Sequence, residues 1–389
     1  MYTGRTVFAQ LMELIPRRAF ERCVARYPSR RQLRTFTCYD QFLCLAFAQL
    51  TYRESLRDIE TCLRALQPKL YHAGFRGRVS RSTLADANET RDWRVYGDFA
   101  QTLIRRARAL YCGAPFAVEL AQTAYAFDAT TIDLCLALFP WARFRRHKAA
   151  VKLHTLLDLR GNIPTVVAIT DGKAADVTLL DALAFEPGAF YILDRGYTDF
   201  GRLYAITEAL ACFVIRGKRG LDYARRRSRP VDKTTGLRSD QTIVLCGPQT
   251  ATLYPVPLRR ITYVDPETQQ RFVFLTNNFT LPPLQIAQLY KCRWQVELFF
   301  KWIKQHLRIK AFYGTSAKAV KTQVWSAISI YVLVAIFKKE LHLQRSLYEL
   351  LQILSLTLFE RVPLSQVVTA FPAQDLLDDP RNQLPLFDL

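Results

Sequence analysis

Four polar residues in one largely apolar segment have side chains that suit joint action on an anion. They are Tyr290, Arg293, Glu297 and Lys304, at offsets of 0, 3, 7 and 14 residues. The apolar spacing after Pro282-Pro283 predicts one long helix that runs to about Leu307. At about 100° per residue the four side chains fall at about 0°, −60°, −20° and −40°, which is one narrow face. An acid that can bind a metal would then lie beside two cations and a phenol that can contact phosphate.

An apolar stripe beside that face predicts how the helix is anchored in a core. The stripe falls at about −80° to −140° and consists of Leu289, Val296, Phe300, Ile303 and Leu307. The competing interpretation is an exposed helix whose Arg293–Glu297 pair contributes only about 0.2–0.5 kcal/mol. In that case Tyr290 and Lys304 would have no shared role.

Two aspartates follow short apolar runs that have the composition of β-strands. Asp128 comes at the end of Ala124–Phe127, and Asp194 comes after Phe190–Leu193. A carboxylate at the end of a buried strand is held at a sheet edge, where clefts form in α/β proteins. One such aspartate means little by itself, because strands often end in Asp for turn chemistry. Asp133 and Asp171 lie near the same runs and are the alternatives if the register is misread.

The spacing Tyr-x2-Arg-x3-Glu-x6-Lys at residues 290–304 resembles the signature of the IS4-family DDE transposases of bacterial insertion sequences. Phe127-Asp128-Ala129-Thr130 looks like the first-aspartate strand of that family. Leu193-Asp194-Arg195-Gly196-Tyr197 resembles its second-aspartate motif. The resemblance is strongest over residues 120–310 and weakest after 340.

The resemblance implies a ribonuclease-H-like core in which Asp128, Asp194 and Glu297 hold two Mg²⁺ (or Mn²⁺) ions and perform catalysis. Oxygen ligands of this kind suit a hard cation, and two ions can serve an in-line phosphoryl displacement. By resemblance, water frees a 3′-hydroxyl at the transposon end and this hydroxyl then attacks target DNA. Tyr290, Arg293 and Lys304 would bind the transposon-end backbone. The implied partners are double-stranded DNA (inverted-repeat ends and target) and a second copy of the chain in a synaptic dimer.

The predicted fold class is α/β: a ribonuclease-H-like core interrupted by a β-rich insertion, with a helical N-terminal DNA-binding domain and a helical C-terminus. Helical spacing dominates residues 1–115, with Ser82 as a candidate N-cap and Arg76, Arg78 and Arg81 beside a possible helix-turn-helix. From about residue 120, three strands in succession and then strands alternating with helices indicate a mixed sheet. The predicted domains are 1–115 (N-terminal), 116–217 (core), 218–275 (insertion), 276–340 (core) and 341–389 (C-terminal).

The insertion begins with a strongly basic stretch, residues 216–238, that shows neither helical nor strand periodicity. It carries nine Lys and Arg against two Asp, and we expect Arg225, Arg226 and Arg227 to bind DNA phosphates; the alternative is a solvated charge run. Short strands are predicted downstream, one of them at Ala251–Tyr254. Some relatives stack a flipped base on a tryptophan of the insertion, but no tryptophan lies within 218–275. Tyr254, Tyr263 and Phe272 are the aromatic side chains that could replace it.

The composition favours a soluble protein that binds polyanions. The formal net charge is +20, with 54 Lys and Arg against 34 Asp and Glu over 389 residues. Nine cysteines without a CxxC pair argue against both a disulfide framework and a thiolate zinc site. The apolar run 324–337 is shorter than the roughly 18–20 residues that span a bilayer, and no secretory signal is evident. We therefore expect a cytoplasmic protein that does not bind membranes, and the resemblance to insertion-sequence transposases implies that it is bacterial and nucleoid-associated.

Two other functions remain open at this stage. A catalytically inactive DNA-binding protein descended from a transposase would bind ends without nicking them. A ribonuclease-H-like nuclease without strand transfer would release cut ends and never join them. The joined product distinguishes both from a transposase.

Overall fold

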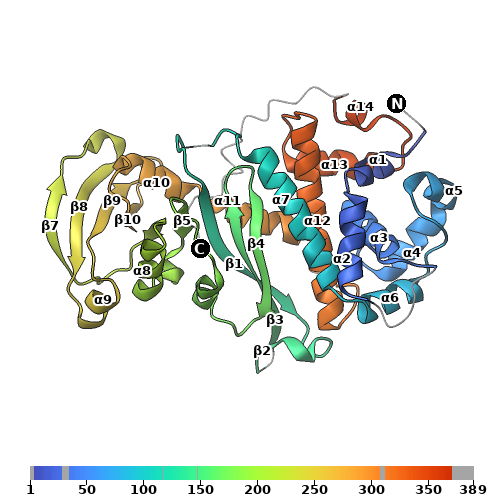
Figure 1. Cartoon of the computed structure of the whole chain (residues 1–389), viewed down its shortest axis with the longest axis horizontal. Helices are drawn as coiled ribbons and strands as arrows, with labels where there is room; N and C mark the ends of the chain where they lie inside the picture. The colour runs from blue at the N-terminus through green and yellow to red at the C-terminus, as the bar shows by residue number, and fades with distance from the viewer. Residues whose placement is uncertain (1–3, 29–34, 117, 147, 307–311, 370–389) are drawn as a thin grey trace. The chain divides into compact units, whose positions relative to one another are not determined.

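The computed structural model describes residues 4–28, 35–116, 118–146, 148–306 and 312–369. Within these ranges the chain forms two compact units, and each is described by itself. One unit contains residues up to 113, 131–151 and those from 299 onward, and it is mainly helical. The other contains 114–130 and 152–298, and it holds most of the sheet (Figure 1).

The helical unit is built on amphipathic helices whose apolar spacing the sequence carries. Its N-terminal helices are α1 (Val7–Glu13), α2 (Arg17–Arg26), α3 (Cys38–Leu50), α4 (Leu56–Ala65), α5 (Gln67–Leu70), α6 (Arg81–Thr90) and α7 (Arg94–Tyr111). The N-cap of α6 is Ser80, whose hydroxyl accepts the Thr83 backbone N–H, so the prediction of Ser82 is wrong. Because α5 and a 3-10 turn (Tyr71–Ala73) separate α4 from α6, these two helices are not joined by the short turn of a helix-turn-helix.

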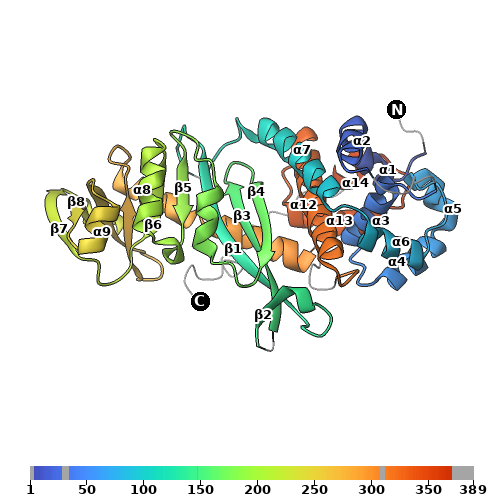
Figure 2. The same cartoon turned by 60° about the horizontal axis from the view of Figure 1, so that its bottom comes forward.

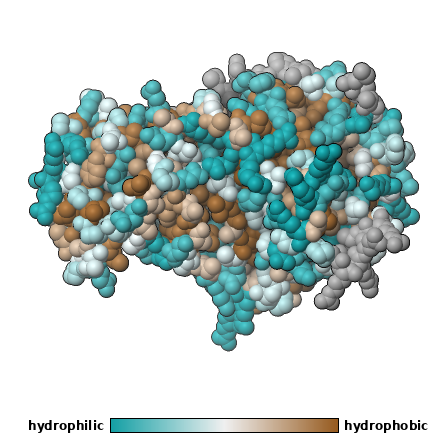
Figure 3. All heavy atoms as spheres, in the orientation of Figure 1, coloured by the Kyte–Doolittle hydropathy of each residue, from teal (hydrophilic) through white to brown (hydrophobic). Residues whose placement is uncertain are grey.

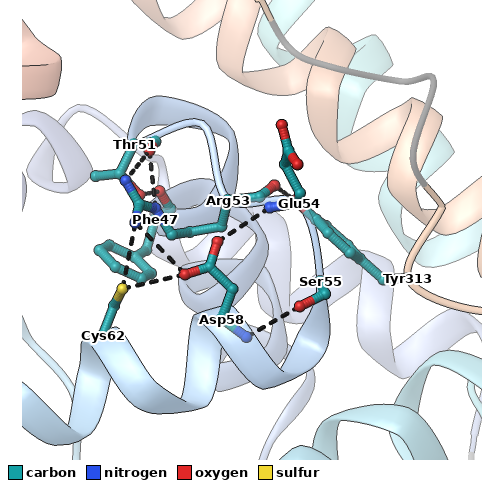
Figure 4. Close-up of polar contacts among 8 residues, drawn as sticks. All are labelled: Phe47, Thr51, Arg53, Glu54, Ser55, Asp58, Cys62 and Tyr313. Atoms are coloured by element: carbon teal, nitrogen blue, oxygen red, sulfur yellow. Dashed lines mark hydrogen bonds and ion pairs between the residues drawn. The ribbon is translucent and has the colours of Figure 1, made fainter.

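The corner between α3 and α4 is fixed by a small polar network (Figure 4). Ser55 caps α4 by accepting the Asp58 N–H at 3.1 Å, and the Asp58 carboxylate accepts the Glu54 N–H at 3.2 Å. The Arg53 guanidinium donates to the Thr51 carbonyl at 2.6 Å. Tyr313, distant in sequence, donates its hydroxyl to the Arg53 carbonyl at 2.7 Å. This last bond connects the N-terminal helices to the C-terminal part of the same unit.

The core of the helical unit is formed by α12 (Ala317–Glu340), which packs mainly against α7 and α3. Its length and hydropathy would allow it to cross a membrane, but 94% of its apolar window is buried inside the protein. It is therefore the central helix of a folded core rather than evidence for a membrane span. Two further helices, α13 (Leu347–Thr357) and α14 (Leu364–Thr369), follow it.

The sheet confirms the mixed α/β fold, with strands in the order β2-β3-β1-β5-β6-β10-β9-β8-β7 and β4 paired to β3. The core strands are β1 (Ala124–Leu134), β3 (Lys148–Asp158), β4 (Ile163–Asp171), β5 (Phe190–Leu193) and β6 (Cys212–Arg216). β5 is parallel to both β1 and β6. Gly161 and Asn162, with φ of 81° and 55°, make the turn between β3 and β4. This arrangement, β4-β3-β1-β5-β6, agrees with the ribonuclease-H-like core that was expected.

The apolar core of this unit lies on one face of the sheet and is covered by α8 (Phe200–Glu208). Phe127, Leu193 and Phe213 project from three neighbouring strands into the same buried cluster as Leu203 of α8. Each of these four side chains is at most 1% exposed. Burying one such side chain stabilises a fold by about 1.5–3 kcal/mol, so this cluster holds the strand ends in register.

The strands beyond β6 continue the same sheet. They are β7 (Tyr223–Arg229), β8 (Leu237–Leu245), β9 (Leu258–Val264) and β10 (Arg271–Thr276), all antiparallel, and β10 pairs with β6. Arg259 of β9 and Asp240 of β8 form a buried ion pair at 2.8 Å. This pair fixes the β8–β9 register, because a slip would leave two charges buried without partners.

Two local predictions in this unit are wrong. Residues 216–238, which show no strand periodicity in the sequence, contain the strand β7. Pairing with β8 forms this strand, and its charged side chains hide it in the sequence pattern. Ala251–Tyr254 is not a strand but lies mostly in helix α9 (Pro248–Leu253), which Pro248 begins at its first position.

Two glycines in the β7–β8 region allow a matched stability test. Gly236 (φ +88°) and Gly220 (φ +76°) both have left-handed backbones, but only at Gly236 would a Cβ overlap the Val264 carbonyl oxygen. We predict that Gly236→Ala destabilises the protein by about 3 kcal/mol or more, from backbone strain plus overpacking. Gly220→Ala should cost only the strain, about 1–2 kcal/mol. Urea unfolding measures both, and equal losses would contradict the close approach at Val264.

Candidate active site

The register between β1 and β5 places the two predicted aspartates side by side. The parallel pairing ends at Phe127↔Leu193, so Asp128 and Asp194 are the residues that directly follow the last pair. Neighbouring strands lie about 4.8 Å apart, and side chains in matching register point to the same face. Asp128 was predicted to be the last residue of its strand, but β1 continues to Leu134. It is the first β1 residue after the β5 pairing stops.

The predicted long helix is broken between the tyrosine and the glutamate. α10 (Pro283–Lys291) ends before Cys292, and α11 (Trp294–Lys301) begins after Arg293. The junction is tight, because Arg293 donates its N–H to the Tyr290 carbonyl at 3.0 Å, an i→i−3 bond. Three residues per turn bring positions i and i+3 into line. The Arg293 guanidinium accordingly lies over the Tyr290 ring, 5.9 Å from its centroid, and the two stay on one face although the helix is interrupted.

Arg293 links two of the predicted acids. Its Nη1 donates to Asp128 Oδ2 at 3.1 Å, and its Nη2 donates to Glu297 Oε1 at 2.5 Å. The side chain is only 16% exposed, and its Nε is buried without a hydrogen-bond partner. The cation is thus held by charge and geometry at this point of the sheet rather than extended into solvent.

The third acid is connected through the tyrosine. The Tyr290 hydroxyl donates to Asp194 Oδ1 at 3.3 Å, and its ring packs on Phe274 at 4.8 Å between centroids. Burial raises the pKa of Tyr290 to about 12, so the phenol stays protonated and a donor at neutral pH. Tyr290 and Arg293 therefore connect Asp194, Asp128 and Glu297 into one cluster.

The acids differ in their exposure to solvent, and burial changes the pKa of a carboxyl group. Burial raises the pKa of Asp128 to about 6, although the Arg293 charge opposes that shift. The Glu297 side chain is 52% exposed and faces solvent beside the cluster. Its helix is tied to the β3–β4 turn, where Asn162 donates to Gln295 at 2.9 Å. A half-buried acid and an accessible one therefore flank the same guanidinium.

The donor set suits a hard divalent cation, since Asp128, Asp194 and Glu297 offer only carboxylate oxygens. In the described parts of the chain, no three His, Cys, Asp or Glu side chains are close enough together to enclose a metal as they are placed. Arg293 accounts for this, because its guanidinium lies between Asp128 and Glu297. A metal ion bound by these acids would have to take the place of the Arg293 guanidinium. The negative charge of the three carboxylates permits this exchange of one cation for another.

The other predicted DNA-binding residues belong to other elements of the chain. Lys304 is half-buried in a π-helical turn (Trp302–His306) of the helical unit. Arg225, Arg226 and Arg227 are exposed on β7, the last strand of the sheet, with a register shift between Arg225 and Arg227. A bulge of this kind at a sheet edge redirects side chains and discourages edge pairing.

Several competing assignments lose support. Asp133 is exposed on the β1 extension, and Asp171 caps a turn by accepting the Lys173 and Ala174 N–H groups. Among the insertion aromatics, Tyr254 and Phe272 are only 1% and 2% exposed and cannot stack a base as placed. Tyr263 is half-buried. Among the stripe residues, Leu289, Val296, Phe300 and Ile303 are buried as predicted, and Leu307 lies outside the described residues.

Two residues near the cluster escaped the sequence interpretation. Arg216 is the last residue of β6, a position similar to that of Asp194 directly after β5. Its guanidinium lies over the Phe272 ring, and its positive charge opposes the rise in the pKa of Tyr290. The same strand-end argument applied to β6 would have found it. Tyr197, 4% exposed, packs its ring on Phe127 and has a buried hydroxyl without a hydrogen-bond partner. Tyr197 is the last residue of the motif Leu193–Tyr197, but no sequence signal shows that its hydroxyl is buried.

Comparison with known proteins agrees with this geometry. Residues 119–333, more than half of the chain, match the family model described as "Transposase DDE domain". Residues 3–76 match "Domain of unknown function (DUF4372)". The chain is 34% identical over 286 residues to "Putative transposase y4zB" of Sinorhizobium fredii (strain NBRC 101917 / NGR234), covering 72% of this chain and 77% of that one.

Two more similarities are weaker. "Probable transposase for insertion sequence element IS5377" of Geobacillus stearothermophilus is 30% identical over 206 residues, covering 53% of this chain and 54% of that one. A solved piggyBac transposase synaptic complex with hairpin DNA aligns with a TM-score of 0.46 at 9% identity, covering 98% of this chain and 84% of that one. A likeness of that size carries no argument about this chain.

The family match and the first relative define the class: the chain belongs to the DDE transposase family. The chain is thus an enzyme of DNA cleavage and strand transfer. Enzymes of this family generally use divalent metal ions.

The raised pKa of Asp128 gives a stability prediction. Its pKa of about 6 lies above the roughly 3.9 of an unfolded chain, so folded-state stability falls as pH rises from about 4 to 6. We predict that Asp128→Asn, in chelator at pH 7.5, has a free energy of unfolding about 1–3 kcal/mol higher than that of the parent and therefore unfolds at a higher temperature. Below about pH 4 the two should coincide. Asp133→Asn is the control and should match the parent at every pH, and a less stable Asp128→Asn at pH 7.5 would contradict the prediction.

Proposed function

We propose that the chain is an IS4-type transposase of a bacterial insertion sequence, which cuts the inverted-repeat ends of its element and joins them to target DNA. The observation that carries the proposal is the cluster in which Tyr290 and Arg293 connect Asp128, Asp194 and Glu297. The family match supports the reaction class, and the Tyr-Arg-Glu-Lys spacing supports the branch.

In this proposal Asp128, Asp194 and Glu297 hold two Mg²⁺ or Mn²⁺ ions. Two such ions would activate the attacking hydroxyl and stabilise the leaving oxygen of an in-line displacement. Asp128 and Asp194 suit the role because their strands fix them in register, whereas Glu297 can adjust because it is exposed on α11. A carboxylate set of this kind supplies oxygen ligands while leaving positions for water and phosphate.

The chain's own cations then act on the DNA. Arg293 would exchange its carboxylate partners for a phosphate oxygen, which its planar guanidinium can bind with two N–H groups. Tyr290 keeps its proton and would donate either to Asp194 or to the DNA backbone. Lys304 and the exposed Arg225, Arg226 and Arg227 would add sequence-independent phosphate contacts.

The bonds exchanged are the same in both steps. Water attacks a phosphodiester at the element's end, the P–O3′ bond breaks, and a 3′-hydroxyl is freed. That hydroxyl then attacks a target phosphodiester, and the target's own 3′-oxygen leaves. We propose that two copies of the chain act on two paired ends, in the bacterial cytoplasm at the nucleoid.

A cleavage assay with matched carboxylate variants tests the proposal. Glu297→Gln should lower Mg²⁺-dependent cleavage of the element's own ends by more than about 100-fold, because even indirect partners of a metal contribute 10- to 100-fold. DNA binding in chelator should stay within a few-fold of the parent. Asp171→Asn and Asp133→Asn serve as controls and should cleave normally.

Three outcomes would overturn the proposal in different ways. Normal cleavage by Glu297→Gln would remove this acid from the site. Cut ends that never join target DNA, by the parent itself, would indicate a nuclease without strand transfer. Tight binding of the ends with no nicking in Mg²⁺ or Mn²⁺ would indicate an inactive binding protein.

A further inference from the structure

A short basic hairpin lies outside the cluster and has no role in the proposal above. It consists of β2 (Arg143–Arg145) with Arg146 and Lys148, and β2 pairs antiparallel with the start of β3. In Figure 1 it lies beside the start of β3, and in the same orientation Figure 3 shows a hydrophilic projection at that place. Figure 2 shows the hairpin from another side.

The charge of the basic hairpin is uncompensated. Between Asp133 and Asp158 the chain has no acidic residue. Arg143, Arg145, Arg146 and Lys148 are all exposed. None of the four makes an ion pair or side-chain hydrogen bond with another described residue, and Arg145 only lies over the ring of Phe144. Elsewhere in the described chain many arginines do pair, for example Arg202 with Asp181 and Asp199.

The pairing register makes this charge unfavourable in the free protein. Arg145 stands directly opposite Lys148 across the two strands. Like charges in that position destabilise a hairpin by up to about 1 kcal/mol. A polyanion placed along the hairpin would remove the repulsion and bind the four cations at once.

The base of the basic hairpin is well anchored, so the cations are presented on a fixed support. Trp141 donates its Nε1–H to the Thr315 carbonyl at 2.7 Å, and Ala142 is fully buried. Phe139, 7% exposed, packs on Phe312 at 6.0 Å between centroids. A charged ribbon with a packed base loses little entropy on binding, unlike a mobile tail.

We propose that the basic hairpin is a second DNA-binding surface, which holds the phosphate backbone of double-stranded DNA without reading its sequence. This rests on the proposed function only in taking DNA as the partner. A two-stranded ribbon has dimensions that the major groove of DNA accepts, and arginine binds phosphate with two parallel N–H groups. Because the contacts are to phosphates, the hairpin should bind the element's ends and unrelated DNA equally.

Salt dependence of binding tests the inference without relying on cleavage. Anisotropy of a labelled unrelated duplex is measured with full-length protein in chelator, over about 50–200 mM salt. Arg145→Gln/Arg146→Gln should reduce the slope of log K against log [salt] by about 1.8, or 0.9 for each lost phosphate contact. The control Lys173→Gln/Arg361→Gln removes two exposed charges elsewhere and should keep the parent's slope.

A second measurement does not depend on any variant. Acetylation of Lys148 in the parent protein should slow several-fold when the duplex is added, whereas Lys173 should react as before. Unfolding in the absence of DNA provides a folding check, since removing the Arg145–Lys148 repulsion should leave the double variant at least as stable as the parent.

The failures are distinguishable. If the parent binds DNA with a steep salt dependence but the hairpin variant keeps that slope and Lys148 is not protected, the basic hairpin is not a binding surface and the proposed function stands. If the parent shows no salt-dependent DNA binding at all, the proposed function fails as well.

Discussion

The site depends on keeping three carboxylates close together against their mutual repulsion. Two charges about 5 Å apart, the spacing that the β1–β5 register gives Asp128 and Asp194, repel by about 3 kcal/mol at an effective dielectric constant of 20. Arg293 offsets this by contacting Asp128 and Glu297 together, and Tyr290 donates to Asp194. The raised pKa of Asp128 shows that burial still exceeds the compensation from Arg293. The site therefore carries more negative charge than Arg293 compensates, and a divalent cation would neutralise the excess.

The fold serves this arrangement through two local devices. The buried cluster around Phe127 and Leu193 fixes the strand register, so two acids stand next to each other without any contact of their own. The tight junction between α10 and α11 then brings Arg293 into line with Tyr290 and leaves Glu297 one turn further on. A straight helix would separate the tyrosine and the arginine by about 60°, and the interruption brings them together.

The elements and the acids could be predicted from the sequence because each has a local signal. Phe190–Leu193 was predicted to the residue, since an apolar run defines this strand. The break at Cys292 could not be predicted, because the residues on both sides favour a helix and only i→i−3 bonding marks the junction. The strand β7 was hidden by its arginines, since an edge strand with an exposed face needs no apolar alternation. The contact of Arg293 with Asp128 joins residues 165 apart in sequence, which only the sheet topology brings together.

The central claim is that Asp128, Asp194 and Glu297 act as one metal site. Binding of Mn²⁺ to the full-length protein with end DNA, followed by electron paramagnetic resonance, tests it most directly. We predict that Asp128→Ala, Asp194→Ala and Glu297→Ala each lose tightly bound Mn²⁺, whereas Asp133→Ala binds as the parent does. Parent-like Mn²⁺ binding by any one of the three would contradict the account, because that acid would then lie outside the site.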